Sequence, residues 1–117
     1  MKIVEAGPAD VESVLPLFLG YLEFYKQESD EPRARQFLHD RLANRESRVF
    51  LALVNDTPVG FVQLYPTFAS LAMKRSWVLY DLFVQPAARK CGVAKALMEH
   101  ARQLAMETEC PAESAGH

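Results

Sequence analysis

The sequence predicts an α/β fold of the α+β type, with helices packed on a mixed sheet, in one domain of 117 residues. An almost continuous apolar run at Trp77–Val84 predicts a strand that is covered on both faces. After Gly92 the apolar residues change to helical spacing, which predicts a helix as far as Met106. The apolar runs Val49–Val54 and Val59–Tyr65 flank a turn and predict an antiparallel hairpin.

The N-terminal part of the chain predicts one strand and two helices. Lys2–Ala6 is a short strand candidate that ends before a Gly-Pro pair. Apolar residues keep helical spacing through Val11–Tyr25, which predicts the first helix. Ser29 or Asp30 can cap a second helix that has Pro32 in its first turn.

Composition and charge narrow the class of protein. Hydrophobic residues make up 50% and charged residues 24% of the chain, as in an ordinary globular domain. A net charge of −2 provides no general electrostatic field for nucleic acid or an acidic membrane. Cys91 and Cys110 lie far apart without a histidine pairing, so neither a metal site nor a disulfide scaffold is predicted. Without a recognisable signal peptide or an apolar run of ~18 residues, we expect a cytoplasmic protein.

The turn before the last predicted helix is chemically unusual. Arg89, Lys90 and Lys95 place positive charge at a helix N-terminus, where the exposed backbone N–H groups are already positive. Residues 86–96 contain no Ser, Thr, Asp or Asn that could cap those groups. An external anion would satisfy both defects, and Gly92 would let a bulky phosphate approach the backbone.

The main alternative to an anion site is a basic turn whose N–H groups are satisfied by water, which explains the same residues. A Walker A loop is excluded because its Gly-Lys-Ser/Thr ending is absent, and no Gly-x-Gly-x-x-Gly motif supports a dinucleotide fold. A generic binder of nucleotide phosphates is a third, weaker hypothesis.

The segment Arg89-Lys90-Cys91-Gly92-Val93-Ala94 resembles the Arg/Gln-x-x-Gly-x-Gly/Ala pyrophosphate loop of the GNAT N-acetyltransferases. Residues 60–62 and 79–84 are similar to the third and fourth strands of that fold, particularly in its diamine acetyltransferase branch. The resemblance covers about residues 2–106 and implies a cytoplasmic N-acetyltransferase that uses acetyl-CoA. It implies no metal, no nucleic acid and no membrane partner.

The resemblance assigns two groups of residues to acetyl-CoA. The exposed backbone of Leu82–Val84 in the fourth strand, where family strands bulge, would pair with the pantetheine arm and polarise the thioester oxygen. The loop and first helical turn would hold the pyrophosphate. The implied cofactor-binding residues are Leu82, Phe83, Val84, Arg89, Lys90, Cys91, Gly92, Val93, Ala94 and Lys95.

The implied reaction is acetyl transfer to a primary amine of a small molecule, either a polyamine or an amino-acid-like compound. Asp81 is the carboxylate of the central strand and is the candidate for binding the amine or accepting its proton. An acid that faces water at the sheet edge, or caps a neighbouring N–H, is the alternative. Tyr80 stands where the diamine branch has Glu, which weakens the assignment of a direct base and leaves a water relay as an alternative.

Aromatic residues are the candidates for the acceptor pocket. By resemblance, the end of the first helix and the connection before the central strand border this pocket. Simple core packing is the alternative for each of them. The candidate substrate residues are Tyr21, Phe24, Tyr25, Tyr65 and Phe68.

The C-terminal segment breaks the resemblance. Residues 107–117 show no apolar alternation, so we expect an irregular tail and a fold truncated after the third main helix. The family's fifth strand and its helix-borne tyrosine acid would then be missing. An unpaired edge on the central strand predicts a homodimer or higher oligomer, and exchange of an element between copies is one way to cover that edge. The alternative function is a catalytically idle relative that binds CoA at most and self-associates.

Overall fold

The computed structural model describes residues 1–107 and 112–114. Short 3-10 turns occupy Pro8–Asp10 and Pro86–Ala88. The helices and strands, in chain order, are β1 (Lys2–Ala6), α1 (Val11–Phe24), α2 (Glu31–Ala43), β2 (Arg48–Val54), β3 (Thr57–Ala69), β4 (Lys74–Val84), α3 (Val93–Glu107) and β5 (Ala112–Ser114).

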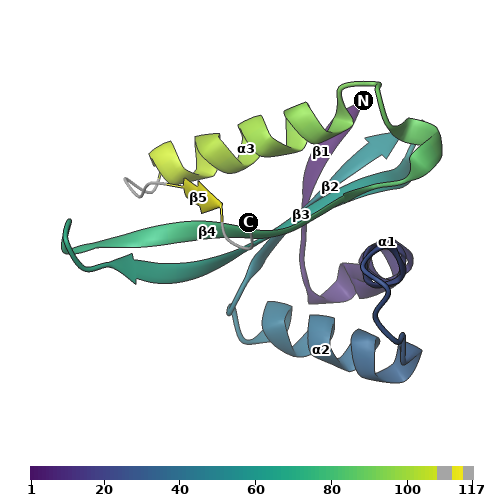
Figure 1. The fold of residues 1–117 in the computed structure, drawn as a ribbon, viewed down its shortest axis with the longest axis horizontal. Helices are drawn as coiled ribbons and strands as arrows, with labels where there is room; N and C mark the ends of the chain where they lie inside the picture. Colours follow the sequence, from purple (N-terminus) through teal and green to yellow (C-terminus); the bar gives the residue numbers. More distant parts are fainter. Residues whose placement is uncertain (108–111, 115–117) are drawn as a thin grey trace.

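One sheet carries the fold, and its strands follow the order β1-β2-β3-β4-β5. Neighbouring strands are antiparallel except β4 and β5, which are parallel, so the sheet is mixed. Helix α3 covers one face of the sheet, and α1 and α2 cover the other (Figure 1). The predicted α+β fold is confirmed. Within the described part of the chain, no helix has both the length and the apolar character that crossing a bilayer requires.

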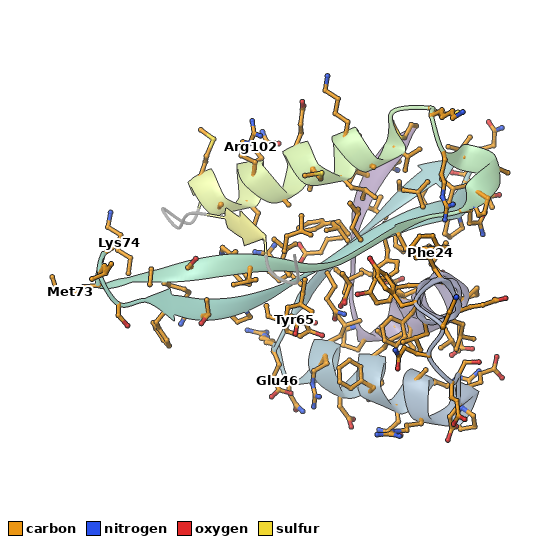
Figure 2. The ribbon with its side chains drawn as sticks, in the orientation of Figure 1. Phe24, Glu46, Tyr65, Met73, Lys74 and Arg102 are labelled. Carbon is orange, nitrogen blue, oxygen red and sulfur yellow. The ribbon has the colours of Figure 1, made fainter. Side chains whose placement is uncertain are left out.

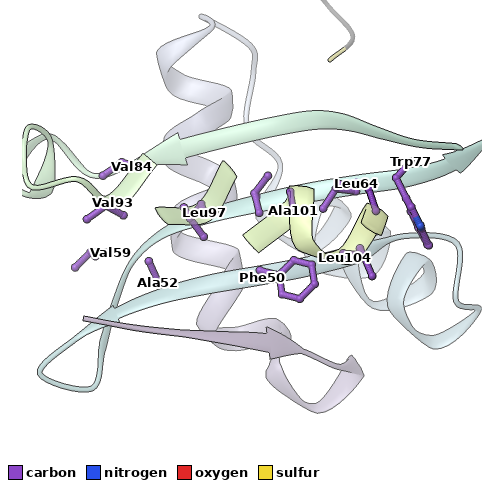
Figure 3. Close-up of a cluster of buried hydrophobic side chains, with 12 residues drawn as sticks. Phe50, Ala52, Val59, Leu64, Trp77, Val84, Val93, Leu97, Ala101 and Leu104 are labelled. Carbon is purple, nitrogen blue, oxygen red and sulfur yellow. The ribbon is translucent and has the colours of Figure 1, made fainter. Parts of the chain in front are cut away.

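The sheet face under α3 is closed by an apolar cluster (Figure 3). A Cβ added to Gly60 of β3 would lie 3.1 Å from a methyl carbon of Val93 and 3.2 Å from one of Val84. This close approach seats the first turn of α3 against the ends of β3 and β4. The cluster consists of Phe50, Ala52, Val59, Val62, Leu64, Trp77, Val84, Val93, Leu97, Ala101, Leu104 and Ala105.

A second apolar cluster packs α1 and α2 against the opposite face. A Cβ added to Gly20 would lie 3.0 Å from ring carbons of Phe83, so the glycine lets α1 pass close to the end of β4. The C-terminal ends of α1 and β4 therefore lie beside each other. The cluster consists of Ala6, Val11, Val14, Leu15, Leu17, Phe18, Ala34, Leu38, Leu42, Val49, Leu51 and Phe61.

The β3–β4 hairpin is longer than the sequence suggests and projects past the helices (Figure 1). The sequence predicts that β3 ends near Pro66, but β3 continues to Ala69, with Pro66 opposite Trp77. Strand β2 begins at Arg48, opposite Leu64, so beyond that point β3 has a strand neighbour only on the β4 side. A proline is tolerated at such an edge because its missing N–H donor can face outward.

The expectation that residues 107–117 are irregular, with no strand beside β4, is wrong where the structure describes them. Helix α3 includes Glu107, and Ala112–Ser114 pairs in parallel with Trp77–Leu79. A strand of 3 residues is too short for alternation to reveal it. Among the described residues, the β4 edge at 80–84 has no strand partner on that side. Truncation and a homodimer stay predictions.

Candidate active site

The ends of α1 and β4 and the start of α3 enclose a cavity of about 340 Å³. A second cavity of about 700 Å³ shares Phe24, Phe83 and Arg89 with it and extends along α1 to Pro16. The structure therefore brings predicted cofactor residues and predicted substrate residues into one region. The smaller cavity is lined by Phe24, Tyr25, Leu82, Phe83, Val84, Arg89 and Ala94.

The loop before α3 contains two residues in the left-handed region. Gly92 has φ 77° and Lys90 has φ 71°. A lysine at position 90 would cost little only if its φ were negative, and that condition is not met. A non-glycine residue costs roughly 1–2 kcal/mol in this region. The strained lysine indicates a loop shape that is held by the surrounding structure.

The amides of this loop are available to an anion. No described residue accepts a hydrogen bond from a backbone N–H of residues 90–95, and the next amide, that of Ala96, donates to the Gly92 carbonyl at 3.0 Å. Left-handed residues that alternate along a turn direct successive N–H groups into a concavity, and the helix N-terminus adds partial positive charge. A Cβ on Gly92 would meet nothing within 4 Å, so the space over the loop is open.

The side chains of the loop divide into two kinds. Arg89 is exposed but folds back onto the protein: its Nε donates to the Val84 carbonyl at 2.9 Å, and its guanidinium lies 5.4 Å from the Phe24 ring centroid and 5.5 Å from that of Phe83. Lys90, Lys95 and the free thiol of Cys91 are also exposed. Cys110 lies outside the described residues.

Strand β4 bulges beside the active region. Gln63 pairs with Asp81, and the next residue of β3 pairs with Leu79, so Tyr80 has no partner in β3. The bulge therefore lies at Tyr80, and the expectation that it lies at Leu82–Val84 is wrong. An extra residue in one strand places consecutive side chains on the same face. Tyr80 and Asp81 accordingly both reach the α1/α2 face, where they contact Tyr65 and Gln63.

The carboxylate of Asp81 is buried, with 6% of the residue exposed. Its Oδ2 accepts a hydrogen bond from Gln63 Nε2 at 2.8 Å, and the Tyr21 hydroxyl lies close to the same carboxylate. Burial raises the pKa of Asp81 above its usual value, and the interactions with Tyr21 and Gln63 oppose that rise. This burial excludes the alternative of an acid that faces water at the sheet edge.

Two residues that the sequence analysis did not single out complete this hydrogen-bonded chain. Gln63 is 0% exposed, and its Oε1 accepts from the Ser47 hydroxyl at 2.8 Å. The signal for Gln63 is its place as a polar residue inside an otherwise apolar run of β3. Ser47, which precedes β2, gives no such signal because serine is ordinary in a connection.

Four of the five predicted substrate aromatics lie on the α1/α2 side of the sheet. The ring of Tyr21 packs 5.1 Å from that of Tyr25, and the ring of Phe24 lies 5.2 Å from Tyr25. Tyr65 contacts Tyr80 at 5.4 Å between ring centroids, and Figure 2 shows it on the side of α2. Burial, and then the nearby Asp81 carboxylate, raises the pKa of Tyr65. Core packing therefore explains part of each position, but not the proximity of Tyr21 and Tyr65 to the same buried acid.

Phe68 is not brought to this group. It lies on the projecting hairpin, 74% exposed, with the Arg75 guanidinium 5.9 Å from its ring centroid. It lines a separate hollow of about 420 Å³ with Arg45 and Glu46 from the end of α2. The long hairpin carries Phe68 away because β3 continues through Pro66.

Comparison with known proteins identifies the class. The model of the acetyltransferase (GNAT) family matches residues 12–115. An uncharacterized N-acetyltransferase of Bacillus subtilis, YhfO, is 46% identical over 105 residues, which cover 90% of this chain and 70% of that protein. A probable acetyltransferase of Haemophilus influenzae is 34% identical over 110 residues, covering 93% of this chain and 75% of that one.

Solved structures agree with the sequence comparisons. The crystal structure of a probable acetyltransferase superposes with a TM-score of 0.93 at 42% identity, covering 99% of this chain and 80% of that one. This chain therefore belongs to the acetyltransferase (GNAT) family. It is an N-acetyltransferase, and the enzymes of its family use acetyl-CoA.

Proposed function

We propose that this enzyme transfers an acetyl group from acetyl-CoA to a primary amine of a small molecule, either a polyamine or an amino-acid-like compound. The observation that carries the proposal is the buried carboxylate of Asp81, which lies at a β4 bulge among tyrosine side chains. An acid in this position offers a proton acceptor and a counter-charge to an amine. A general base works best with a pKa near the working pH, and burial moves that of Asp81 in this direction.

The loop before α3 suits the pyrophosphate of acetyl-CoA. The amides of residues 90–95 lack acceptors among the described residues, and the space over Gly92 is open. Lys90 and Lys95 add positive charge from exposed positions. The Val93 side chain is buried, so only its amide serves the anion. A distant structure of a Clostridium acetobutylicum acetyltransferase with acetyl-CoA has the same fold, at a TM-score of 0.81 and 13% identity.

The end of β4 suits the pantetheine arm. Among the described residues, the β4 edge at Leu82–Val84 has no strand partner on the β5 side, and these residues line the 340 Å³ cavity. Backbone groups at such an edge can pair with an extended amide-containing chain. Acetyl-CoA supplies the activated acetyl thioester. The protein has to hold it beside the bulge at Tyr80 and bring an amine to its other side.

The tyrosines around Asp81 suit an amine. An ammonium group is attracted to aromatic faces and to a carboxylate, and it becomes a nucleophile only when it has lost a proton. Asp81 accepts that proton directly or through water beside Tyr80, which is 56% exposed. A Caenorhabditis elegans relative named thialysine N-epsilon-acetyltransferase, 23% identical over 111 residues, supports an amine on an amino-acid-like chain.

The experiment measures CoA thiol release with a panel of polyamines and amino acids, together with thermal stabilisation by CoA. We expect stabilisation by CoA, and turnover with at least one primary amine that falls strongly in Asp81→Asn. Gln36→Leu, which removes a surface hydrogen bond to Asp40, is the control and should turn over normally. Full activity in Asp81→Asn, or stabilisation without turnover for every amine, would overturn the proposal.

A further inference from the structure

The Asp81 carboxylate has neutral donors only. Among the described residues it forms no ion pair; Gln63 donates a hydrogen bond to it, and the neutral hydroxyl of Tyr21 lies close to it. Tyr65 of β3 and Tyr80 of β4 also lie near it, and Arg41 of α2 lies near Tyr65. The negative charge of Asp81 is therefore stabilised by neutral groups, Tyr21 of α1 and Gln63 in the interior of the sheet.

These two donors differ in their surroundings. Tyr21 is partly exposed on α1 among aromatic rings that border the cavity. Gln63 is fully buried in the middle of β3, opposite Asp81 in the strand register, and cannot leave without breaking the core. Ligand binding can rearrange the first donor, whereas the second is fixed.

We propose that Gln63, oriented by Ser47, is a positioning residue that fixes Asp81 and directs its incoming proton toward the acceptor site. This inference rests on the proposed role of Asp81. Gln63 touches neither substrate nor acetyl-CoA; it acts through the carboxylate. The structural basis is the chain that runs from the Ser47 hydroxyl to Gln63 Oε1, and from Gln63 Nε2 to Asp81 Oδ2, with both links at 2.8 Å.

The direction of the chain follows from what each group can donate. An ionised carboxylate only accepts, so the amide must present Nε2 to Asp81. Its Oε1 then points to Ser47, whose hydroxyl satisfies it. An amide flipped the other way would set Oε1 against Oδ2, with like partial charges in contact. Ser47 thus stabilises the one orientation that serves Asp81, because a buried unpaired Oε1 would be costly.

This arrangement also selects the oxygen that takes the proton. An amide N–H already occupies one acceptor site of Oδ2, which leaves Oδ1 with more free acceptor capacity as far as the Gln63 bond is concerned. In this proposal the proton from the amine adds to Oδ1. The N–H bond of the ammonium breaks, an O–H bond forms on Asp81, and the amine keeps the electron pair. The proton leaves again to solvent after the acetylated product has been released.

The test is the pH dependence of kcat/KM in Gln63→Leu and Ser47→Ala, with acetyl-CoA and the best amine of the panel. In the wild type, kcat/KM should rise with pH as Asp81 ionises, and this rise is the acidic limb of the profile. Gln63→Leu removes a donor that lowers the pKa of Asp81, so the acidic limb should move to higher pH. On that limb kcat/KM should fall about tenfold, as for the loss of one hydrogen bond to a charged group. Ser47→Ala should move the limb in the same direction by less, and KM for acetyl-CoA should stay unchanged in both variants.

Gln36→Leu is the matched control, because Gln36 Nε2 also donates to a carboxylate, Asp40 Oδ1, at 2.8 Å, but on the surface. Its pH profile should overlay that of the wild type. If Gln63→Leu does not fold, Ser47→Ala carries the test alone. A limb that stays in place in the folded variants, while Asp81→Asn abolishes it, would overturn the positioning role of Gln63 and leave the proposed function standing. If Asp81→Asn shows the same limb as the wild type, the proposed function itself would be overturned.

Discussion

The two faces of the sheet are built from different chemistry. The α3 face is closed by an apolar cluster of aliphatic and aromatic side chains with Leu97 at 0% exposure (Figure 3). The α1/α2 face has an apolar cluster of similar composition, but it also carries Ser47, Gln63 and Asp81, buried and joined by hydrogen bonds. Burial of polar groups costs free energy unless hydrogen bonds compensate for it, and on the second face the bonds among these three residues supply that compensation.

The two faces of the sheet position different parts of the candidate site. The α3 face fixes the start of α3, through Val93 against Gly60, and thereby the loop that offers its amides. The α1/α2 face fixes the carboxylate and the tyrosines. Strand β4 belongs to both: Val84 and Trp77 face α3, while Phe83 and Asp81 face α1 and α2. Substitutions on the two faces should therefore affect different measurements.

The largest effect should come from Asp81 on the α1/α2 face. Asp81→Asn keeps the shape of the side chain and removes its ability to accept a proton, so kcat should fall about 10²- to 10⁴-fold, as for loss of a general base. The free energy of unfolding at neutral pH should not fall, because the variant avoids burying a charge. Steady-state kinetics and urea unfolding of the same preparation check both. A variant with a lower free energy of unfolding and normal kcat would contradict a catalytic role for Asp81 and indicate a structural one.

Leu97 on the α3 face should show the opposite pattern. Leu97→Ala leaves a cavity beneath the middle of α3 and should lower the free energy of unfolding by about 2–5 kcal/mol. Its kcat, per folded molecule, should stay near the wild-type value. Met98→Ala, at the next position and 48% exposed, should change stability by less than about 0.5 kcal/mol. Equal losses in the two variants would contradict the described core.

The loop that joins the two faces should respond at Gly92. Gly92→Ala meets no steric contact, but its φ of 77° disfavours any side chain by about 1–2 kcal/mol. The loop should relax away from this shape, so KM for acetyl-CoA should rise about tenfold with little change in kcat. Kinetics with varied acetyl-CoA measure this. An unchanged KM would mean that these amides do not bind the cofactor.

The smallest effect should come from Lys90, where the substitution should raise the free energy of unfolding slightly instead of lowering it. Lys90→Gly relieves a φ of 71° but adds flexibility to the unfolded chain, so the free energy of unfolding should rise by no more than about 1 kcal/mol. The loss of one exposed positive charge should raise KM for acetyl-CoA slightly, and more at low salt. Thermal unfolding and kinetics at two ionic strengths check the result. A clear loss of stability would contradict the left-handed conformation.

The sequence predicts the parts that follow local periodicity. The run Trp77–Val84, the hairpin and the helix after Gly92 all appear, because apolar spacing determines which face of each element is buried. The bulge at Tyr80 and the chain through Gln63 depend on the register between β3 and β4, which one-dimensional spacing does not show. The strand Ala112–Ser114 was missed because its pairing is shorter than any readable pattern.

The central claim, that the buried acid on the α1/α2 face takes the proton of the amine, is tested most directly by the pH dependence of kcat/KM in wild type and Asp81→Asn. Burial raises the pKa of Asp81, so wild-type kcat/KM should rise with pH as this group ionises, along a limb above the usual range for aspartate. In Asp81→Asn that limb should be absent, leaving only the rise due to the amine itself. The same limb in both proteins would contradict the claim.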